Sequence, residues 1–200
     1  MLCLTSPTRA AWIEAALADL DAVLIDHAHC EIKAATNALS LAARVPPSMA
    51  PALGALAEEE VRHFREVLDL LVARGLSLGL PSEDHYAKEL RAIAHRTAPD
   101  GRSPEQTLLD RLLVAALVEA RSCERFKVLA EALTRRGAAE LAAFYDGLFA
   151  AEARHYRTLV DMAIDLVGGD EARVRRRLSV LADEEGKLVE RLSDSAAIHG

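Results

Sequence analysis

The chain has 200 residues and a formal net charge of −7, and 51% of its residues are hydrophobic while only 4% are aromatic. This length suits one domain with a sizeable core, and abundant alanine and leucine with few aromatic residues favour closely packed helices over strands. The N-terminus has no basic segment followed by an apolar one, and no stretch reaches the roughly 18 apolar residues of a membrane span. We therefore expect a cytoplasmic, all-α protein with no membrane partner, forming a single domain over residues 1–200.

Two helical patterns occupy the first part of the chain. The first runs from about residue 7 to residue 44, and the acidic residues near 19–21 mark a point where it can break. Pro46 and Pro47 end it, because proline disfavours helical backbone in the residue before it. The second pattern runs from about residue 51 to residue 74, and Gly75 follows as a C-cap.

A long connection follows over residues 76–103, in which two turn clusters flank a short amphipathic helix at about 83–95. Such a crossover lets the third helix return parallel to the second, as in ferritin-like four-helix bundles. We therefore expect a bundle core over about residues 7–167, with this crossover inside it.

The third and fourth bundle helices have clear ends. Ser103 and Gln106 form a capping box that opens the third helix, which ends near residue 136. The fourth runs from about residue 138 to residue 167, and two glycines stop it. An extra C-terminal helix at about 170–192 lies outside the bundle core.

Two E-x-x-H motifs, Glu60-x-x-His63 and Glu152-x-x-His155, lie inside these helical patterns. Residues three apart share a helix face, so each motif presents a carboxylate and an imidazole to the same point. The motifs interrupt apolar stripes, and so do Glu31 and Glu119 on the two preceding helices. Each of the four helices therefore brings one glutamate inward.

Buried carboxylates need compensation, because an isolated one costs several kcal/mol or takes up a proton, and four together repel one another. Two divalent cations would cancel four carboxylates. A carboxylate-rich donor set favours iron or manganese, and the His-Glu-x-x-His motif of zinc peptidases is absent. An isolated E-x-x-H is commonly just a solvated helix face, but two copies with partner glutamates indicate a metal site. The predicted ligands are Glu31, Glu60, His63, Glu119, Glu152 and His155.

Three further residues are candidates to lie beside these ligands: Glu124, Cys123 and Cys30. A weak internal duplication aligns Glu31 with Glu124 rather than Glu119. Glu119 is nevertheless preferred, because the residues before and after it on the same helix face are apolar. The alternative for Glu124 is a surface pair with Lys127. Both cysteines can equally be packing residues, and with only three cysteines in the chain we expect reduced thiols rather than disulfides.

The wording around the motifs resembles the tRNA hydroxylases of the MiaE type. The segments that carry the resemblance are DHAHCEIKAA (26–35), EEEVRHF (58–64), EARSCERF (119–126) and FAAEARHY (149–156). The resemblance implies a ferritin-like, nonheme di-iron monooxygenase that uses O2 to hydroxylate the isopentenyl chain of methylthio-isopentenyl-adenosine in the anticodon loop of tRNA. The six predicted ligands match the ligand pattern of that family.

Several partners follow from this resemblance. The chain has no flavin or nicotinamide fingerprint and no iron–sulfur cysteine cluster, so an external electron donor, a separate reductase or electron-transfer protein, is implied. The net charge of −7 is unfavourable for binding tRNA, because the negatively charged phosphates need a basic protein surface. The candidate tRNA-binding residues are Arg173, Arg175, Arg176 and Arg177, with further arginines at Arg91, Arg96, Arg102, Arg135 and Arg136, although each can also be ordinary solvated helix surface.

Other functions remain compatible with the pattern. Parts of this pattern also occur in three other classes of protein: a ferritin-like protein that oxidises or stores iron, a rubrerythrin-like peroxidase and a metal-free helical interaction domain. A storage cage would be very large, whereas we expect a hydroxylase to be a monomer or small oligomer. The rubredoxin-like Cys-x-x-Cys module that usually accompanies rubrerythrin does not occur in the sequence.

Overall fold

The computed structural model describes residues 2–81, 83–99, 103–192 and 195–199, and Arg102 lies outside these ranges. Within them the chain forms seven α-helices and no strands, which confirms the all-α class. None of the helices in the described ranges is long and apolar enough to cross a membrane. The chain divides into two compact units, one made of Met1–Arg9 with His85–Leu192 and the other of Ala10–Asp84 with Ser193–Gly200. We call them the α5–α6 unit and the α2–α3 unit. A single domain remains a prediction.

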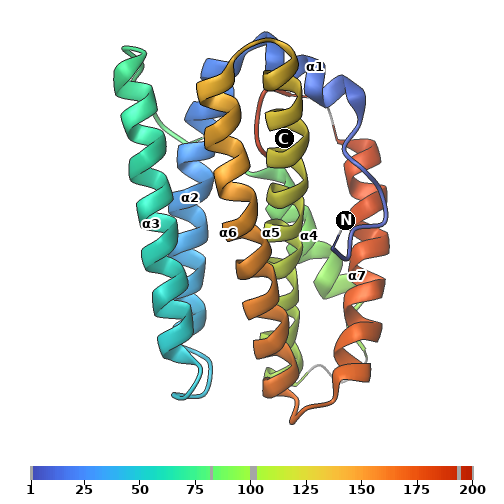
Figure 1. Cartoon of the computed structure of the whole chain (residues 1–200). Helices are drawn as coiled ribbons and strands as arrows, with labels where there is room; N and C mark the ends of the chain where they lie inside the picture. Colours follow the sequence, from blue (N-terminus) through green and yellow to red (C-terminus); the bar gives the residue numbers. More distant parts are fainter. Residues whose placement is uncertain (1, 82, 100–102, 193–194, 200) are drawn as a thin grey trace. The chain divides into compact units, whose positions relative to one another are not determined.

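The α2–α3 unit contains α1 (Ala10–Ala18), α2 (Leu20–Ala42) and α3 (Ala50–Ala73). Helices α2 and α3 pack side by side in opposite directions (Figure 1). Asp19 separates α1 from α2, because its side chain accepts the Ala22 N–H at 3.0 Å and caps α2. The first predicted helix is therefore broken at Asp19, within the acidic stretch 19–21 where the sequence allowed a break.

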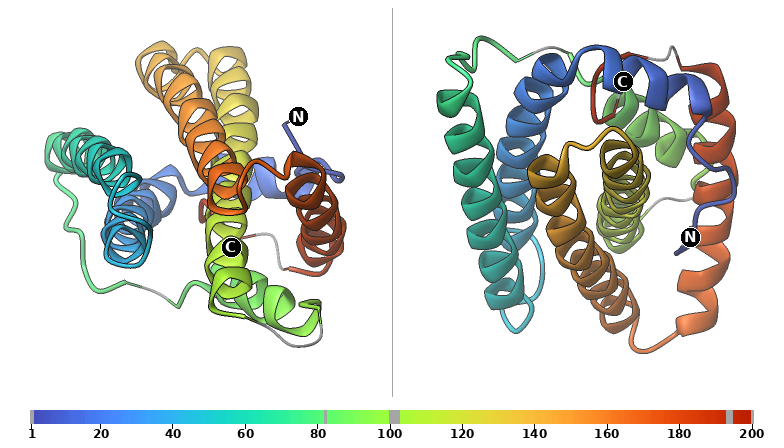
Figure 2. Two further views of the ribbon diagram at one scale, coloured as in Figure 1. Left: turned by 90° about the horizontal axis from the view of Figure 1, so that it is seen from below. Right: turned by 45° about the horizontal axis from the view of Figure 1, so that its top comes forward.

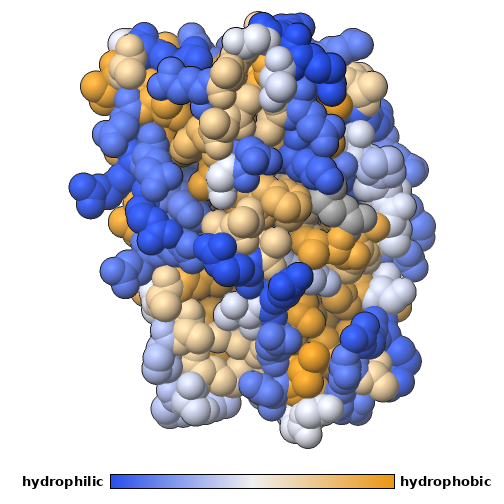
Figure 3. Space-filling view, in the orientation of Figure 1, coloured by the Kyte–Doolittle hydropathy of each residue, from blue (hydrophilic) through white to orange (hydrophobic). Residues whose placement is uncertain are grey.

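Gly75 ends α3 as the sequence predicts. Its φ of 70° lies in the left-handed region that favours glycine. This geometry lets the Leu76 N–H donate to the Leu71 carbonyl at 2.9 Å, which satisfies a carbonyl of the last turn. The side of α3 away from α2 is largely hydrophilic, as the left edge of Figure 3 shows.

The α5–α6 unit contains α4 (His85–Arg96), α5 (Pro104–Arg135), α6 (Ala139–Leu166) and α7 (Glu171–Arg191). Helices α5 and α6 run antiparallel, and α4 and α7 also pack on α5 (Figure 2). Ser103 caps α5 as predicted, since its Oγ accepts the Gln106 N–H at 3.0 Å. The capping box is only half formed, because the Gln106 side chain bonds to Asp110 and Arg173 instead. Because α5 has neighbours on several sides, every residue from 119 to 126 is buried.

The N-terminal segment differs from the prediction, because α1 begins at Ala10 rather than near residue 7. The Thr8 N–H donates to Glu124 Oε1 at 2.8 Å, and Arg9 Nη2 donates to the Leu192 carbonyl at 2.6 Å. These contacts hold the segment against α5 and the end of α7, so the Thr8 N–H bonds to a side chain of α5 instead of to a helical carbonyl.

A buried ionic network, here the Arg121 network, joins the elements of this unit. Arg121 donates from Nε and Nη2 to the two oxygens of Glu185 at 2.8 and 2.9 Å, and from Nη1 to Glu124 Oε2 at 2.9 Å. The Tyr86 hydroxyl donates to Glu185 Oε1 at 2.8 Å, and the Thr8 hydroxyl donates to Glu124 Oε2. Arg121 and Glu185 have fully buried side chains. The network therefore ties α4, α7 and the N-terminal segment to α5.

We expect Arg121→Ala to lower the free energy of unfolding by about 3–5 kcal/mol, because it leaves the buried carboxylates of Glu185 and Glu124 without their cation. The matched control is Arg175→Ala, which removes an exposed arginine paired with Glu171 at 2.8 Å. That loss should cost less than about 1 kcal/mol. Urea denaturation of both variants measures the difference, and equal midpoints would contradict the role of the network.

Candidate metal centre

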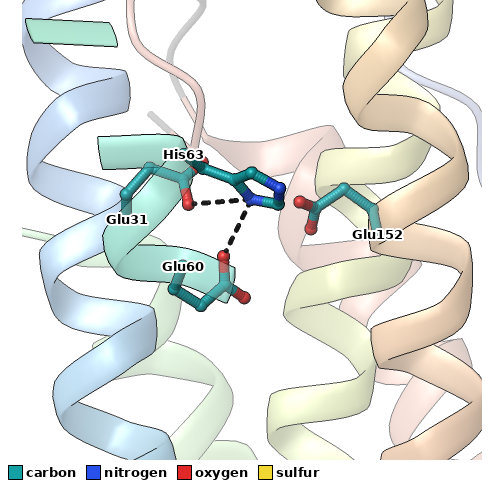
Figure 4. Close-up of side chains that lie close together, drawn as sticks. All are labelled: Glu31, Glu60, His63 and Glu152. Carbon is teal, nitrogen blue, oxygen red and sulfur yellow. Dashed lines mark hydrogen bonds and ion pairs between the residues drawn. The ribbon is translucent and has the colours of Figure 1, made fainter. Parts of the chain in front are cut away.

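The first cluster, here the α2–α3 cluster, consists of Glu31 from α2 and Glu60 and His63 from α3. All three are buried, and each offers a ligand atom within 4.8 Å of those of the other two. His63 Nδ1 lies 3.3 Å from Glu60 Oε2 and 3.7 Å from Glu31 Oε2 (Figure 4). One imidazole nitrogen and two carboxylates therefore converge within a single unit of the chain.

The positions of these residues follow from the apolar stripes that they interrupt. Leu56, Glu60, His63 and Val67 recur at helical spacing on α3, and all four are buried. The same periodicity that buries the leucine and the valine buries the ligands, because helical spacing sets the direction of a side chain whatever its polarity.

The two oxygens of the Glu31 carboxylate have different surroundings. Oε1 lies 2.7 Å from His27 Nε2, within hydrogen-bonding distance. Oε2 is buried and has no hydrogen-bond partner among the described residues, and it faces His63. A buried carboxylate oxygen without a donor is destabilising unless a cation lies nearby. The donor set and this oxygen therefore fit a divalent metal ion.

The electrostatics of the α2–α3 cluster point the same way. Burial alone would lower the pKa of His63, but its close polar contacts with Glu31 and Glu60 and their negative charges outweigh burial and raise its pKa to about 9. Burial alone would raise the pKa of Glu31, but the hydrogen bond with His27 and the nearby imidazole of His63 lower it below its usual value. The cluster thus attracts positive charge, and a metal ion would bind by replacing the proton of His63.

The second cluster, here the α5–α6 cluster, consists of Glu119 from α5 and Glu152 and His155 from α6. All three are buried. His155 Nδ1 lies 3.9 Å from Glu119 Oε2, and Glu152, drawn on α6 in Figure 4, lies three residues before His155. Each unit therefore carries two glutamates and one histidine whose Nδ1 points to the glutamate of the neighbouring helix.

Glu124, the alternative to Glu119, has both oxygens occupied in the Arg121 network. It is only 5% exposed, so the alternative expectation of a surface pair with Lys127 is wrong. The reason is the burial of α5 on several sides, which the spacing of charges along one helix does not reveal. The nitrogen of Lys127 instead lies 5.8 Å from the ring centre of Phe149.

The two cysteines point to atoms outside the clusters. The Cys30 thiol lies 3.6 Å from Asp26 Oδ2, and burial raises its pKa well above the usual value. The Cys123 thiol lies 3.6 Å from the Phe149 carbonyl, and burial, followed by the charge of Glu119, raises its pKa to about 11. All three cysteines of the chain are free thiols, as expected.

The arginines of α7 occupy different environments. Arg177 is buried and donates to both oxygens of Asp110 at 2.7 and 3.1 Å, and also to the Ala94 and Thr97 carbonyls. It therefore joins α7 to α5 and to the end of α4. Arg173 donates to Glu105 at 2.8 Å.

Arg175 and Arg176 are exposed, on the stretch of α7 whose surface is hydrophilic at the lower right of Figure 3. Arg175 pairs with Glu171 on its own helix. Of the four candidate arginines, these two leave their side chains most open to a partner.

Sequence reasoning missed His27 and Arg121. His27 lies four residues before Glu31 on the same face of α2, and this spacing was a readable signal. Arg121 had no such signal, because its partner Glu185 lies 64 residues away in sequence. Both side chains are fully buried.

Comparison with a solved structure defines the class. A protein described as "Protein 43 with aldehyde deformylating oxygenase activity from Synechococcus" is 36% identical, with a TM-score of 0.83 over 100% of this chain and 96% of that one. The chain accordingly has the ferritin-like, all-α fold predicted from its crossover connection.

Relatives then give the family. A Pseudomonas putida protein named tRNA 2-(methylsulfanyl)-N(6)-isopentenyladenosine(37) hydroxylase is 40% identical over 195 residues, which are 96% of this chain and 89% of that protein. A Salmonella typhimurium protein of the same name is 36% identical over 129 residues, 64% of this chain and 44% of that protein. The family described as tRNA-(MS[2]IO[6]A)-hydroxylase (MiaE) matches residues 1–200, and the chain belongs to it.

Proposed function

We propose that this chain hydroxylates the isopentenyl side chain of the methylthio-isopentenyladenosine at position 37 of tRNA, using two iron ions and O2. Membership of the hydroxylase family over the full chain supports the substrate. The observation that carries the chemistry is the burial of all six proposed ligands, with Glu31, Glu60 and His63 converging in one unit and His155 lying 3.9 Å from Glu119 in the other. This family match also favours a hydroxylase over iron storage or a peroxidase.

In this proposal the ligands divide between the two units. Glu31, Glu60 and His63 would hold one ion in the α2–α3 unit, and Glu119, Glu152 and His155 would hold the other in the α5–α6 unit. Iron bound by these residues would supply the redox capacity for activating O2. The four carboxylates balance the charge of two divalent ions, and the two Nδ1 atoms provide neutral donors.

The choice of Glu119 over Glu124 rests on what each carboxylate contacts. Glu124 accepts hydrogen bonds from Thr8 and Arg121, so binding a metal would require breaking a buried ion pair. Glu119 faces His155 instead. Removing Glu124 from the Arg121 network would be strongly destabilising, whereas binding through Glu119 disturbs no such pair.

The overall reaction requires further partners. One oxygen atom of O2 enters a C–H bond of the side chain and the other leaves as water, which consumes two electrons and two protons. We propose that a separate reductase or electron-transfer protein supplies the electrons. The enclosure of both clusters among apolar side chains excludes water from the reacting atoms. We propose a cytoplasmic location, because the proposed substrate is tRNA.

The proposed ligands predict the metal content. Purified protein loaded with ferrous iron under anaerobic conditions should hold about two ions per chain, as bundles with this ligand set do. Glu60→Ala and His155→Ala should each lose at least one ion, because each removes a donor that no neighbour replaces. Glu58→Ala is the matched control, since Glu58 is an exposed glutamate on the same helix. Full iron content in both ligand variants would refute the assignment.

The proposed reaction predicts a defined product. Iron-loaded protein, given O2 and an electron donor, should add one oxygen atom to methylthio-isopentenyladenosine in tRNA, as measured by mass spectrometry of the digested nucleosides. Glu60→Ala should lose this activity and Glu58→Ala should keep it. Transfer RNA that lacks the modification is the negative substrate. No oxygen gain by protein shown to hold its iron would exclude this reaction while leaving the metal centre intact.

We further propose that the exposed arginines of α7 contact tRNA phosphates. The double variant Arg175→Ala/Arg176→Ala should weaken tRNA binding and flatten its dependence on salt by about one unit of slope per lost phosphate contact. Arg177 is left intact, because its bonds to Asp110 hold α7 in place. The comparison variant Arg135→Ala/Arg136→Ala removes the same charge from another candidate surface, the end of α5, so a loss of affinity confined to the α7 variant would assign the contact to α7. Equal affinity and slope in wild type and the α7 variant would reject this surface.

A further inference from the structure

His27 is a fully buried histidine that the six proposed ligands do not include. It lies on α2, one helical turn before Glu31, and its Nε2 atom is 2.7 Å from Glu31 Oε1. The other oxygen of Glu31 faces His63 at 3.7 Å. The two oxygens therefore have separate roles, since one is held by His27 and the other is left for the cluster.

We propose that His27 is a positioning residue that holds Glu31 so that this carboxylate binds metal through Oε2 alone, and that it makes the α2–α3 cluster the tighter of two unequal metal sites. This inference rests on the proposed function, since it requires metal at both clusters. The hydrogen bond fixes the side-chain rotation of Glu31 before metal arrives. Ligating carboxylates are commonly held by such hydrogen bonds, and losing one weakens metal binding.

Within the described part of the α5–α6 unit, the α5–α6 cluster has no equivalent of His27. One turn before Glu119, α5 carries Ala115, which has no side-chain donor. One turn after Glu119, the Cys123 thiol lies against the Phe149 carbonyl. Among the described residues of the α5–α6 unit no hydrogen bond reaches the Glu119 carboxylate, and its ion pair within this unit is with His155 at 3.9 Å. Glu119 therefore lacks the fixed orientation that His27 gives to Glu31.

The same helix provides a matched control. His29 is also buried, two residues after His27, but its Nε2 atom lies 3.2 Å from the Leu78 carbonyl. Replacing His29 removes a buried imidazole and a hydrogen bond from α2 without touching Glu31. A general effect of a lost histidine on folding would therefore appear in both variants, whereas an effect on Glu31 would appear only at His27.

The test is a titration of metal-free protein with Co2+, followed by the absorption of the bound ion and by calorimetry. Wild type should bind two ions with different affinities. His27→Ala should weaken the tighter step by about 10–100-fold and leave the weaker step unchanged. His27→Gln keeps an N–H donor at a similar reach and should recover most of that loss. His29→Ala should match wild type in both steps, with melting curves recorded for every variant.

Each other outcome has a defined meaning. Unchanged binding in His27→Ala, or an equal loss in His29→Ala, would overturn the positioning role. Complete loss of one ion in His27→Ala without rescue by glutamine would instead make His27 a ligand, and would also overturn it. Failure of wild type to bind Co2+ would count against the metal centre of the proposed function, a result distinct from failure of the His27 inference alone.

Discussion

The constraint on which this structure depends is the burial of four glutamates inside apolar helix faces. A buried carboxylate is unstable unless positive charge compensates it. Glu31 and Glu60 converge on His63, and Glu119 faces His155. The raised pKa of His63 and the unsatisfied Oε2 of Glu31 both reflect this concentration of negative charge. The proposed metal ions would resolve this conflict in each unit, and would allow the helices to place charged residues where leucine or valine would otherwise pack.

The Arg121 network solves the same problem in another way. Glu119 and Glu124 lie five residues apart on one buried helix, yet Glu124 is compensated by a guanidinium and a threonine while Glu119 faces a histidine. An arginine paired on both sides holds its partners rigidly and leaves no coordination position open. A cluster of histidine and glutamate leaves its oxygens available to a metal. This contrast distinguishes Glu124, which joins structural elements, from Glu119, which is a proposed metal ligand.

Sequence reasoning succeeded where the signal is local. Helix ends at Asp19, Gly75 and Ser103 follow from caps within a few residues, and the burial of the six proposed ligands follows from the period of an apolar stripe. It failed where partners are distant. The arginine run of α7 looks like a solvated surface, but Arg177 is buried because Asp110, 67 residues away, lies beneath it. The position of the N-terminal segment was missed for the same reason. Its Thr8 N–H donates to Glu124, which lies 116 residues away in sequence.

The acidic composition and the tRNA substrate are reconciled by where the charges lie. The net charge of −7 includes the four buried glutamates of the clusters, and two divalent ions would cancel these, which leaves −3 for the rest of the chain. Other buried acids, among them Glu185 and Asp110, are matched by Arg121 and Arg177. The field that a phosphate backbone meets at the surface is therefore weaker than the composition suggests, so a few exposed arginines can orient the RNA.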